Sequence, residues 1–302
     1  MIFNTHTNVL DHIAKSQLNE NNEIVDSYHI PEQLEGNVTG GIWIYSIDSK
    51  QTLINNFSQE TENILSELKA SDNIQLVMSK DDWDDQSVNV VLGINGLSFI
   101  EEIQDLEKIY QLGFRYGALD LSREHLNQFS FRTDKALTDK GFDLINRMND
   151  LGMIIDVSQE DEKILKQIKQ TTTKPLIASC SNCYTLTPHK NNLTDEQIKF
   201  IAETDGVIGI TPTRNLLTEP TIESLVDHID YLKKIIGIRH IALGLNFKNY
   251  LTNETSYLDE CQNITQASNI IDELLKRNYN SSEVEAIATL NAKRVINKNL
   301  KD

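Results

Sequence analysis

The sequence predicts an α/β protein built on a (β/α)8 TIM barrel. Short runs rich in β-branched residues alternate with amphipathic stretches, which is the pattern of repeated βα units with a mostly parallel sheet. Several of the runs are apolar almost throughout, as expected of strands that are covered on both faces. No Gly-x-Gly-x-x-Gly motif follows a strand, which disfavours a doubly wound sheet that binds a dinucleotide.

The expected elements follow one another along the whole chain. Eight strands are expected at residues 2–6, 38–46, 88–94, 114–120, 153–158, 175–180, 206–211 and 240–246. Residues 74–79 are a candidate extra short strand, and the acidic run at 80–85 is expected to be a solvated loop. Helices are expected at residues 99–112, 138–151, 194–203, 221–236, 268–277 and 281–297.

The ends of several helices carry recognisable signals. Thr138 is an expected N-cap, and Thr194 with Gln197 three residues later has the spacing of a capping box. Gly152 and Gly237 follow expected last turns, where glycine is common. No linker, low-complexity tract or internal repeat divides the sequence, so residues 1–302 are expected to form a single barrel domain.

Composition limits the class of partner. The formal net charge of -17 opposes binding to nucleic acid or to an anionic membrane surface, because like charges repel at long range. The first residues lack the regions of a secretory signal, and no apolar run approaches the roughly 18 residues that span a bilayer. The three cysteines fit a reducing compartment. We therefore expect a cytoplasmic protein with no nucleic-acid and no membrane partner.

Uncharged side chains predominate where a barrel of this kind places its chemistry, at the carboxyl ends of its strands. The residues at or just after those ends are His6, Asn8, Asn95, Leu121, Gln159, Cys180, Thr211 and Asn246. Blocks at residues 112–116, 136–141, 147–158, 192–198, 206–210 and 226–230 resemble, in order and spacing, the membrane (renal) dipeptidase family of zinc metallopeptidases. The resemblance implies a metallo-dependent hydrolase-like barrel, usually a homodimer, that hydrolyses dipeptides with two zinc ions bridged by a glutamate.

The resemblance assigns the family's metal and acid/base positions to residues of this chain. The family's first strand ends His-x-Asp, and here the corresponding residues are His6 and Asn8. The bridging glutamate corresponds to Asn95 in Gly-Ile-Asn-Gly, and the acid/base aspartate corresponds to Asn246 in Gly-Leu-Asn-Phe. Three carboxylates of the family are therefore amides here.

Four further positions follow from the same resemblance. Two metal-binding histidines correspond to Gln159 and to Cys180 in Ser-Cys-Ser-Asn. The arginine that binds the substrate carboxylate corresponds to Asn191, and the histidine that orients the substrate falls near Leu121. Asp156 has a family counterpart and is expected to orient its neighbours rather than to bind metal.

These replacements predict a catalytically degenerate member of the family. An amide oxygen is a poor zinc ligand, and His6 and Cys180 alone are fewer than the three protein ligands of a typical catalytic zinc. Loss of the acid/base carboxylate removes proton transfer, typically a factor of ~10²–10⁴. We expect no metal and assign no catalytic residue. The barrel mouth is expected to bind a small polar ligand or a peptide, or the protein acts through a partner, as a homodimer by resemblance.

Alternatives stay open at this point. One is an active metallohydrolase with an altered one-metal site that uses His6 and Cys180. Another is a thiol redox protein that uses Cys180 and Cys183, which have Cys-x-x-Cys spacing. Arg214, after the seventh strand, is a candidate for binding an anion at the mouth.

Two histidines outside these positions have structural expectations. His189 is expected to pack within its loop near the mouth. His228 lies on an amphipathic helix and is expected at the surface or in an interface.

Overall fold

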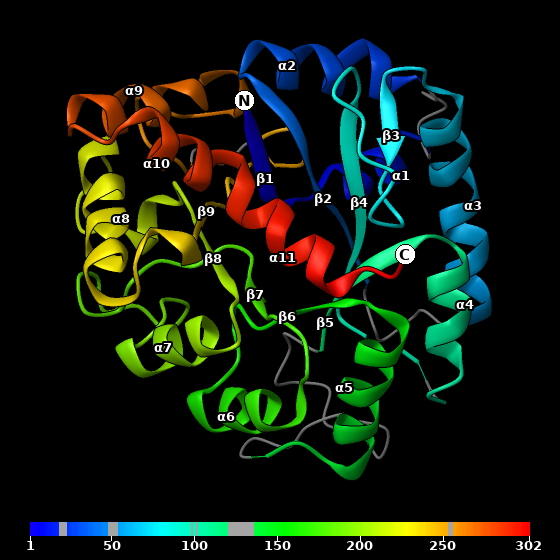
Figure 1. Ribbon diagram of the computed structural model, residues 1–302. Helices are drawn as coiled ribbons and strands as arrows, with labels where there is room; N and C mark the ends of the chain where they lie inside the picture. Colours follow the sequence, from blue (N-terminus) through cyan, green and yellow to red (C-terminus); the bar gives the residue numbers. More distant parts are fainter. Residues whose placement is uncertain (18–22, 48–53, 98, 101, 120–135, 253–255) are drawn as a thin grey trace.

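A closed parallel β-barrel forms the centre of the protein, as the computed structural model shows for residues 1–17, 23–47, 54–97, 99–100, 102–119, 136–252 and 256–302 (Figure 1). Its strands are β1 (Ile2–Thr7), β2 (Val38–Ser46), β4 (Val88–Asn95), β5 (Phe114–Ala118), β6 (Ile154–Asp156), β7 (Ile177–Ala178), β8 (Val207–Ile210) and β9 (Ile241–Leu243). Each pairs in parallel with the next, and β9 returns to β1. The predicted (β/α)8 TIM barrel is confirmed.

The extra strand predicted before β4 is also present. Strand β3 (Ile74–Leu76) pairs with the first half of β4, whereas β5 pairs with its second half. Strand β3 therefore adds to the outside of the barrel without entering the closed ring. The run at residues 80–85 contains no strand or helix, as expected of a solvated loop.

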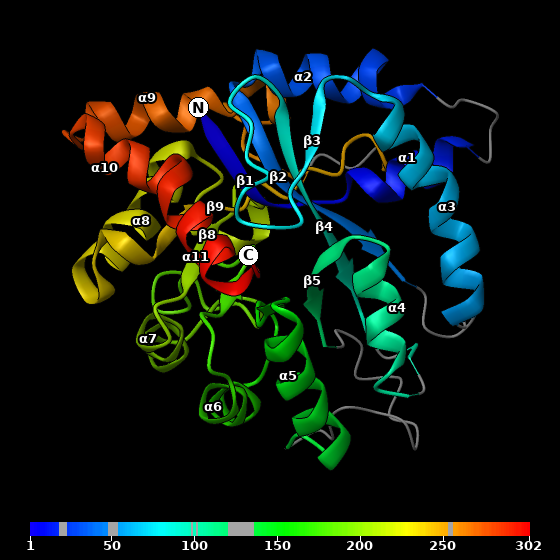
Figure 2. The ribbon, with the colours of Figure 1, turned by 45° about the vertical axis from the view of Figure 1, so that its right-hand side comes forward.

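Helices surround the barrel (Figures 1 and 2). They are α1 (Val9–Gln17), η1 (Val25–His29), α2 (Ile30–Glu35), α3 (Ile54–Ala70), α4 (Asp105–Gln111), α5 (Asp139–Leu151), α6 (Glu162–Thr171), α7 (Asp195–Glu203), η2 (Arg214–Leu216), α8 (Ile222–Ile236), η3 (Ile238–His240), η4 (Ile264–Gln266), α9 (Ser268–Lys276), α10 (Ser281–Glu285), η5 (Ala286–Leu290) and α11 (Asn291–Asn299).

The predicted helix ends are confirmed where the sequence carried a capping signal. The Thr138 side chain accepts a hydrogen bond from the Gly141 backbone, and Thr194 forms a reciprocal capping box with Gln197. Gly152 follows α5 with a φ of 77°, a left-handed conformation that glycine adopts without strain.

One predicted helix begins later than expected. Residues 99–112 were expected to be helical throughout, but α4 begins at Asp105. Phe99 and Ile100 are instead buried in the core, and the Ile100 backbone N–H donates to Leu97 O in a turn. Burial of the two apolar side chains outweighs their helical spacing at this point.

The amino-terminal end of the barrel is closed by α11, which crosses it in Figure 1. Val295, Ile296 and Leu300 belong to the same apolar cluster as the barrel-interior side chains Phe3 and Tyr116. A larger cluster fills the layer between the outer faces of the strands and the surrounding helices. With one end packed in this way, the opposite, carboxyl end is the place for a site.

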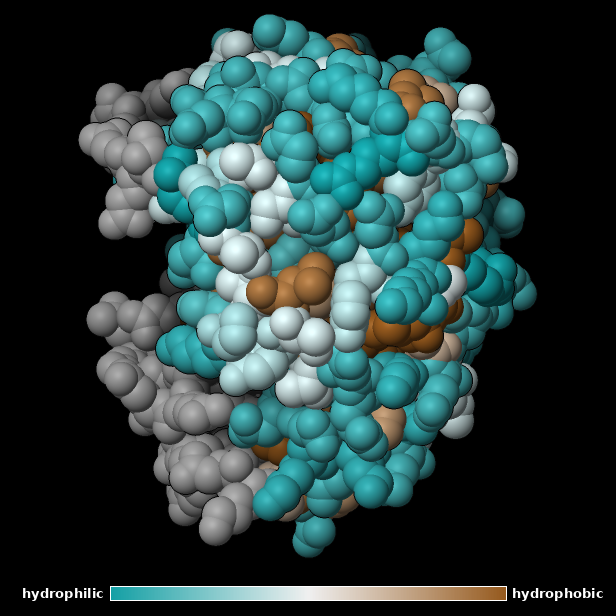
Figure 3. All heavy atoms as spheres, turned by 90° about the vertical axis from the view of Figure 1, so that its left-hand side faces the viewer, coloured by the Kyte–Doolittle hydropathy of each residue, from teal (hydrophilic) through white to brown (hydrophobic). Residues whose placement is uncertain are grey.

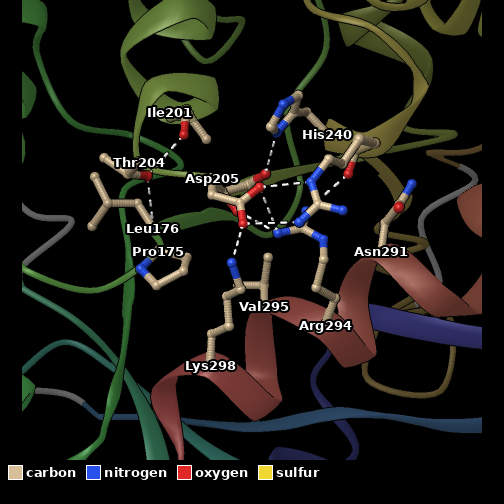
Figure 4. A network of polar contacts seen from close by, with 12 residues as sticks. Pro175, Leu176, Ile201, Thr204, Asp205, His240, Asn291, Arg294, Val295 and Lys298 are labelled. Atoms are coloured by element: carbon tan, nitrogen blue, oxygen red, sulfur yellow. Dashed lines mark hydrogen bonds and ion pairs between the residues drawn. The ribbon is translucent and has the colours of Figure 1, made fainter.

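A carboxylate with several cationic partners fixes α11 at this end (Figure 4). The Asp205 carboxylate accepts hydrogen bonds from Arg239 Nε (2.9 Å) and from Lys298 on α11, and Arg294 Nη1 on α11 lies 2.9 Å from Asp205 Oδ1. The hydrogen bond from Arg239, with those charges, holds the pKa of the Asp205 carboxyl well below its usual range. The network therefore joins α11 to the loop before β8 and to η3.

Replacing Asp205 by asparagine is expected to lower the free energy of unfolding by about 1–2 kcal/mol, because the cations lose a common partner in a partly exposed network. Asparagine tolerates the left-handed φ of 58° at this position, so the change removes charge and keeps the backbone. Urea denaturation at pH 7 measures the effect.

The pH dependence of this difference has a defined sign. A carboxyl with a depressed folded pKa stabilises above its unfolded pKa of 3.8, and the contribution is lost as the pH falls below that value. The matched control is Asp227→Asn, which removes a more exposed ion pair with Arg277 and should cost less. Equal effects of the two substitutions would contradict the role given to Asp205.

The outer surface over α7, α8 and α9 is mostly hydrophilic, with only small separate hydrophobic areas (Figure 3). Within the part of the chain that the structure describes, no helix has both the length and the apolar character needed to cross a membrane.

Candidate functional site

Five of the predicted site residues lie together at the carboxyl end of the barrel, and the strand order explains why. Asn95 ends β4 and pairs with Ser46 of β2, whose hydroxyl accepts a hydrogen bond from Asn8 Nδ2 (3.0 Å). On the other side of β1, the Asn246 backbone N–H donates to His6 O (2.9 Å). Cys180 follows Ser179, the partner of the His6 side chain.

The other predicted site residues are less closely connected. Gln159, after β6, is exposed, and Asn191 is half-buried in the loop before α7. No hydrogen bond between described residues joins either side chain to the mouth. The Asn191 backbone N–H donates to His189 Nδ1 (3.2 Å), so His189 packs within its loop. Leu121 lies outside the described residues.

A buried polar network lies beneath the mouth and is centred on Asp156. Its Oδ1 accepts from the Ser158 hydroxyl (2.6 Å) and backbone N–H (2.8 Å), while its Oδ2 accepts from the Ser179 hydroxyl (2.6 Å) and from the Tyr116 hydroxyl. Burial keeps the pKa of Tyr116 well above its usual value, so the phenol remains a donor. Asp156 therefore orients hydroxyl groups that come from the middle of β5 and from the residues just after β6 and β7.

His6 is connected to this network through one ring nitrogen. Its Nδ1 lies 2.8 Å from Ser179 Oγ. Because that hydroxyl donates to Asp156, Nδ1 is assigned as the donor to it, and Nε2 is the unprotonated nitrogen. Burial, together with the positive charge of Lys248, lowers the pKa of His6 to about 3. The imidazole is therefore neutral at physiological pH.

Two of the amides are held by the protein and keep an unsatisfied oxygen. Asn8 Nδ2 donates to Asp11 Oδ2 (2.7 Å), and burial raises the pKa of the Asp11 carboxyl. Asn246 adopts a φ of 50°, a left-handed conformation in which asparagine is enriched. Asn8 Oδ1 and Asn246 Oδ1 are both buried without a hydrogen-bond partner among the described residues.

The cysteines near the mouth are free thiols in an environment that favours the protonated form. Burial, followed by the Asp156 charge, raises the pKa of Cys180 to about 12, and burial raises that of Cys183. The Cys183 backbone N–H donates to His228 Nδ1 (3.0 Å). His228 is 1% exposed, so the expectation that it lies at the surface or in an interface is wrong. Its ring accepts this hydrogen bond inside the protein.

A cavity of about 470 Å³ opens beside Asn246. It is lined by Thr213, Arg214, Asn215, Asn246, Lys248, Thr252, Ser256 and Tyr257. Arg214 and Asn246 were predicted site residues, whereas Lys248 was not, although it follows the end of the last strand by only a few residues. Tyr116, Ser158 and Ser179 were not predicted either, because their hydroxyl groups come together only when β5, β6 and β7 lie side by side in the barrel.

Comparison with known proteins shows the family to which this chain belongs. The family model described as membrane dipeptidase, peptidase family M19, matches residues 2–301. The chain belongs to this family. Dipeptidase tcpJ of Claviceps purpurea is 27% identical over 215 residues, covering 68% of this chain and 50% of that protein. An uncharacterised protein in the pqqA 5' region of Klebsiella pneumoniae is 35% identical over 162 residues, covering 49% of this chain and 60% of that protein.

The chain spans about half to three fifths of the length of these two curated relatives. Among solved structures, a metallopeptidase from Rhodobacter sphaeroides with a phosphinate mimic of the dipeptide L-Ala-D-Ala matches with a TM-score of 0.85. Its sequence identity is 18%, and the match covers 99% of both chains. At this identity the match supports the membrane dipeptidase fold and says nothing of shared chemistry.

The two zinc ions of the membrane dipeptidase family require a donor set that these positions do not supply. Asn95 and Asn246 are neutral where the resemblance places a bridging glutamate and an aspartate, and amides are weak zinc ligands. Within the described residues, no group of three or more His, Cys, Asp and Glu side chains is placed to hold a metal ion. The side chains present therefore do not fit a dinuclear zinc site.

Proposed function

We propose that this member of the membrane dipeptidase family does not hydrolyse dipeptides through a dinuclear zinc site. It acts instead by binding a small polar ligand at the mouth of its barrel, or through contacts with a partner protein. The observation that carries the proposal is that Asn95 and Asn246 stand where the resemblance places the family's bridging glutamate and acid/base aspartate.

Charge balance is the physical reason for the proposal. Two zinc ions bring four positive charges to a small volume, and anionic ligands must balance them. Of the set carried over from the family, His6 is neutral, Asn8, Asn95 and Asn246 are amides, and Cys180 is a protonated thiol. Two carboxylates lie nearby, Asp11 beside Asn8 and Asp156 beneath the mouth. Asp156 already accepts hydrogen bonds from Ser158, Ser179 and Tyr116, and two carboxylates cannot balance four positive charges.

Even with bound metal, the side chains needed for proton transfer and for binding the substrate carboxylate would be missing. An amide at Asn246 cannot transfer the proton that the family's aspartate transfers, which typically contributes a factor of ~10²–10⁴. An amide at Asn191 cannot form the bidentate ion pair by which an arginine binds a carboxylate. The proposal therefore rests on the loss of several independent functions.

The two alternative functions have weaker support. A one-metal site would use His6 Nε2 and Cys180, but burial and the Asp156 charge favour the protonated thiol over the thiolate that binds metals. The same raised pKa values make Cys180 and Cys183 poor redox nucleophiles. A single domain over residues 1–302, a homodimer and a cytoplasmic location remain predictions that accompany the proposal.

The proposal is tested by assaying dipeptide hydrolysis with added zinc. The purified protein and an active zinc dipeptidase are incubated with the same panel of dipeptides, including L-Ala-D-Ala. We expect hydrolysis by this protein to stay at the rate of a zinc-containing blank. Zinc-stimulated turnover that His6→Ala abolishes would overturn the proposal.

A further inference from the structure

The cavity beside Asn246 has a lining unlike the rest of this acidic protein. Of its eight described lining residues, Arg214 and Lys248 are cationic, none is acidic, and five carry neutral amide or hydroxyl groups that can donate hydrogen bonds, with Tyr257 completing the wall. The chain as a whole has a formal net charge of -17. A volume of about 470 Å³ suits a small molecule.

Lys248 is fixed at the point where the cavity meets the barrel mouth. Its backbone N–H donates to the Tyr257 hydroxyl (2.7 Å), which donates to Asn246 O (2.7 Å). These bonds fix the backbone on either side of Phe247, and so fix where the Lys248 side chain starts. No hydrogen bond or ion pair joins its ammonium to another described residue.

The ammonium of Lys248 acts on two counterparts of the family metal site, His6 and Cys180, and on the nearby Asp11 carboxyl. Its positive charge contributes to lowering the pKa of His6, and it opposes the rise in the pKa of Cys180 and of Asp11. These three groups come from two different strand ends and from α1. A lysine is therefore the source of positive charge near the positions where the family holds its metal ions.

Arg214, the second cationic residue of the lining, has donor capacity remaining. Its Nε donates to Tyr257 O (3.1 Å), and one terminal nitrogen pairs with Asp259 (2.7 Å), whose side chain is 75% exposed. The other terminal nitrogen, Nη1, has no hydrogen-bond partner among the described residues. An exposed ion pair of this kind is weak, so it leaves the guanidinium available to a ligand.

We propose that this cavity binds a small organic anion, bearing a carboxylate or a phosphate group, between the Lys248 ammonium and the Arg214 guanidinium. The distant negative charges of the protein do not prevent this, because physiological salt screens charges beyond about 8 Å. Asn246 Oδ1, which has no hydrogen-bond partner among the described residues, can accept a hydrogen bond from a hydroxyl or amino group of the same ligand. This inference rests on the proposed function, because it assigns the ligand class of that mouth.

The test is calorimetric titration of protein treated with EDTA, at an ionic strength of about 0.15 M, with three separate probes. Succinate and inorganic phosphate distinguish a carboxylate ligand from a phosphate ligand, and neutral succinamide is the uncharged match of succinate. We expect binding of at least one anion and none of succinamide. Lys248→Met should weaken the binding at least about tenfold, Lys248→Arg should largely preserve it, and Arg214→Gln should weaken it.

The matched control is Lys234→Met, which removes the same charge from an exposed position on α8. It should leave anion binding unchanged, and circular dichroism with thermal unfolding should show that all variants are folded. Absence of anion binding by the metal-free wild type, equal binding by Lys248→Met, or binding that requires zinc would overturn the inference. Zinc-dependent dipeptide hydrolysis would instead overturn the proposed function, and the two failures are therefore distinguishable.

Discussion

Acidification from pH 7.5 to pH 5.5 is expected to lower the free energy of unfolding by about 4 kcal/mol. Burial lowers the pKa of His6 and of His29 to about 3, and that of His228 to about 4, from 6.5. Each ring is therefore neutral in the folded protein and takes up a proton when the chain unfolds. Each stabilises fully above pH 6.5, and one pH unit below it each loses about 1.4 kcal/mol.

Urea denaturation at the two pH values measures this loss. Asp11 works in the opposite direction, since burial raises the pKa of its carboxyl. The diagnostic variant is His228→Asn, whose side-chain oxygen can still accept the hydrogen bond from the Cys183 backbone. It should remove about a third of the pH dependence. Stability that stays constant between pH 7.5 and 5.5 would mean that the three rings are not buried in neutral form.

Replacement of Asp156 by alanine is expected to destabilise the fold by about 3–5 kcal/mol. The change leaves the hydroxyl groups of Tyr116, Ser158 and Ser179 without their common acceptor inside the barrel. It also removes the acceptor of the Ser158 backbone N–H. Buried donors that lose their partner cost more than the net value of the hydrogen bond itself. The midpoint of urea denaturation at pH 7 provides the measurement.

Asparagine at the same position separates charge from hydrogen bonding. In Asp156→Asn one oxygen still accepts from Ser158, and the new amino group can donate to the hydroxyl groups of Ser179 and Tyr116, so the loss should be about 1–2 kcal/mol. Asp143→Ala, on the exposed side of α5, is the control and should change stability by no more than ~0.5 kcal/mol. Similar losses for Asp156→Ala and Asp143→Ala would show that the network does not stabilise the protein.

The sequence predicts strands and helices well where short-range patterns of apolar residues and capping residues mark them. Strand β2 has the predicted bounds, and its apolar residues Ile42 to Tyr45 form a continuous run in its second half. Strand β7 is shorter than predicted because Pro175 has no N–H to donate, while the backbone N–H groups of Ser179 and Cys180 donate to side chains of the Asp156 network. Strand β9 also ends early, since the Leu245 backbone N–H donates to Asn4 Oδ1.

The helix α6 was missed although its sequence carried a signal. Ile164, Leu165 and Ile168 have helical spacing and are all buried. Its N-cap residue, Asp161, forms no capping hydrogen bond with its side chain, and no glycine marks the other end. The spacing of its apolar residues alone is therefore enough to predict this helix, without a capping signal.

For the site, individual residues could be predicted from the sequence. The contacts between them could not, because they form only when the barrel closes. Asn8, Asn95 and Asn246 could be located from strand ends and from family resemblance. The effect of Lys248 on His6 and Cys180 could not, because it depends on the closure of β9 against β1 and on the order β7, β8, β9. Contacts between residues more than 60 positions apart in the chain carry no local pattern.

The zinc content of the purified protein shows whether the barrel mouth holds a dinuclear zinc site. The protein is prepared with supplementary zinc, freed of loosely held ions by gel filtration, and its zinc is measured by atomic emission together with that of His6→Ala. We expect less than one equivalent of zinc per chain, with no difference between the two proteins. Two equivalents per chain in the wild type, lost in His6→Ala, would contradict it.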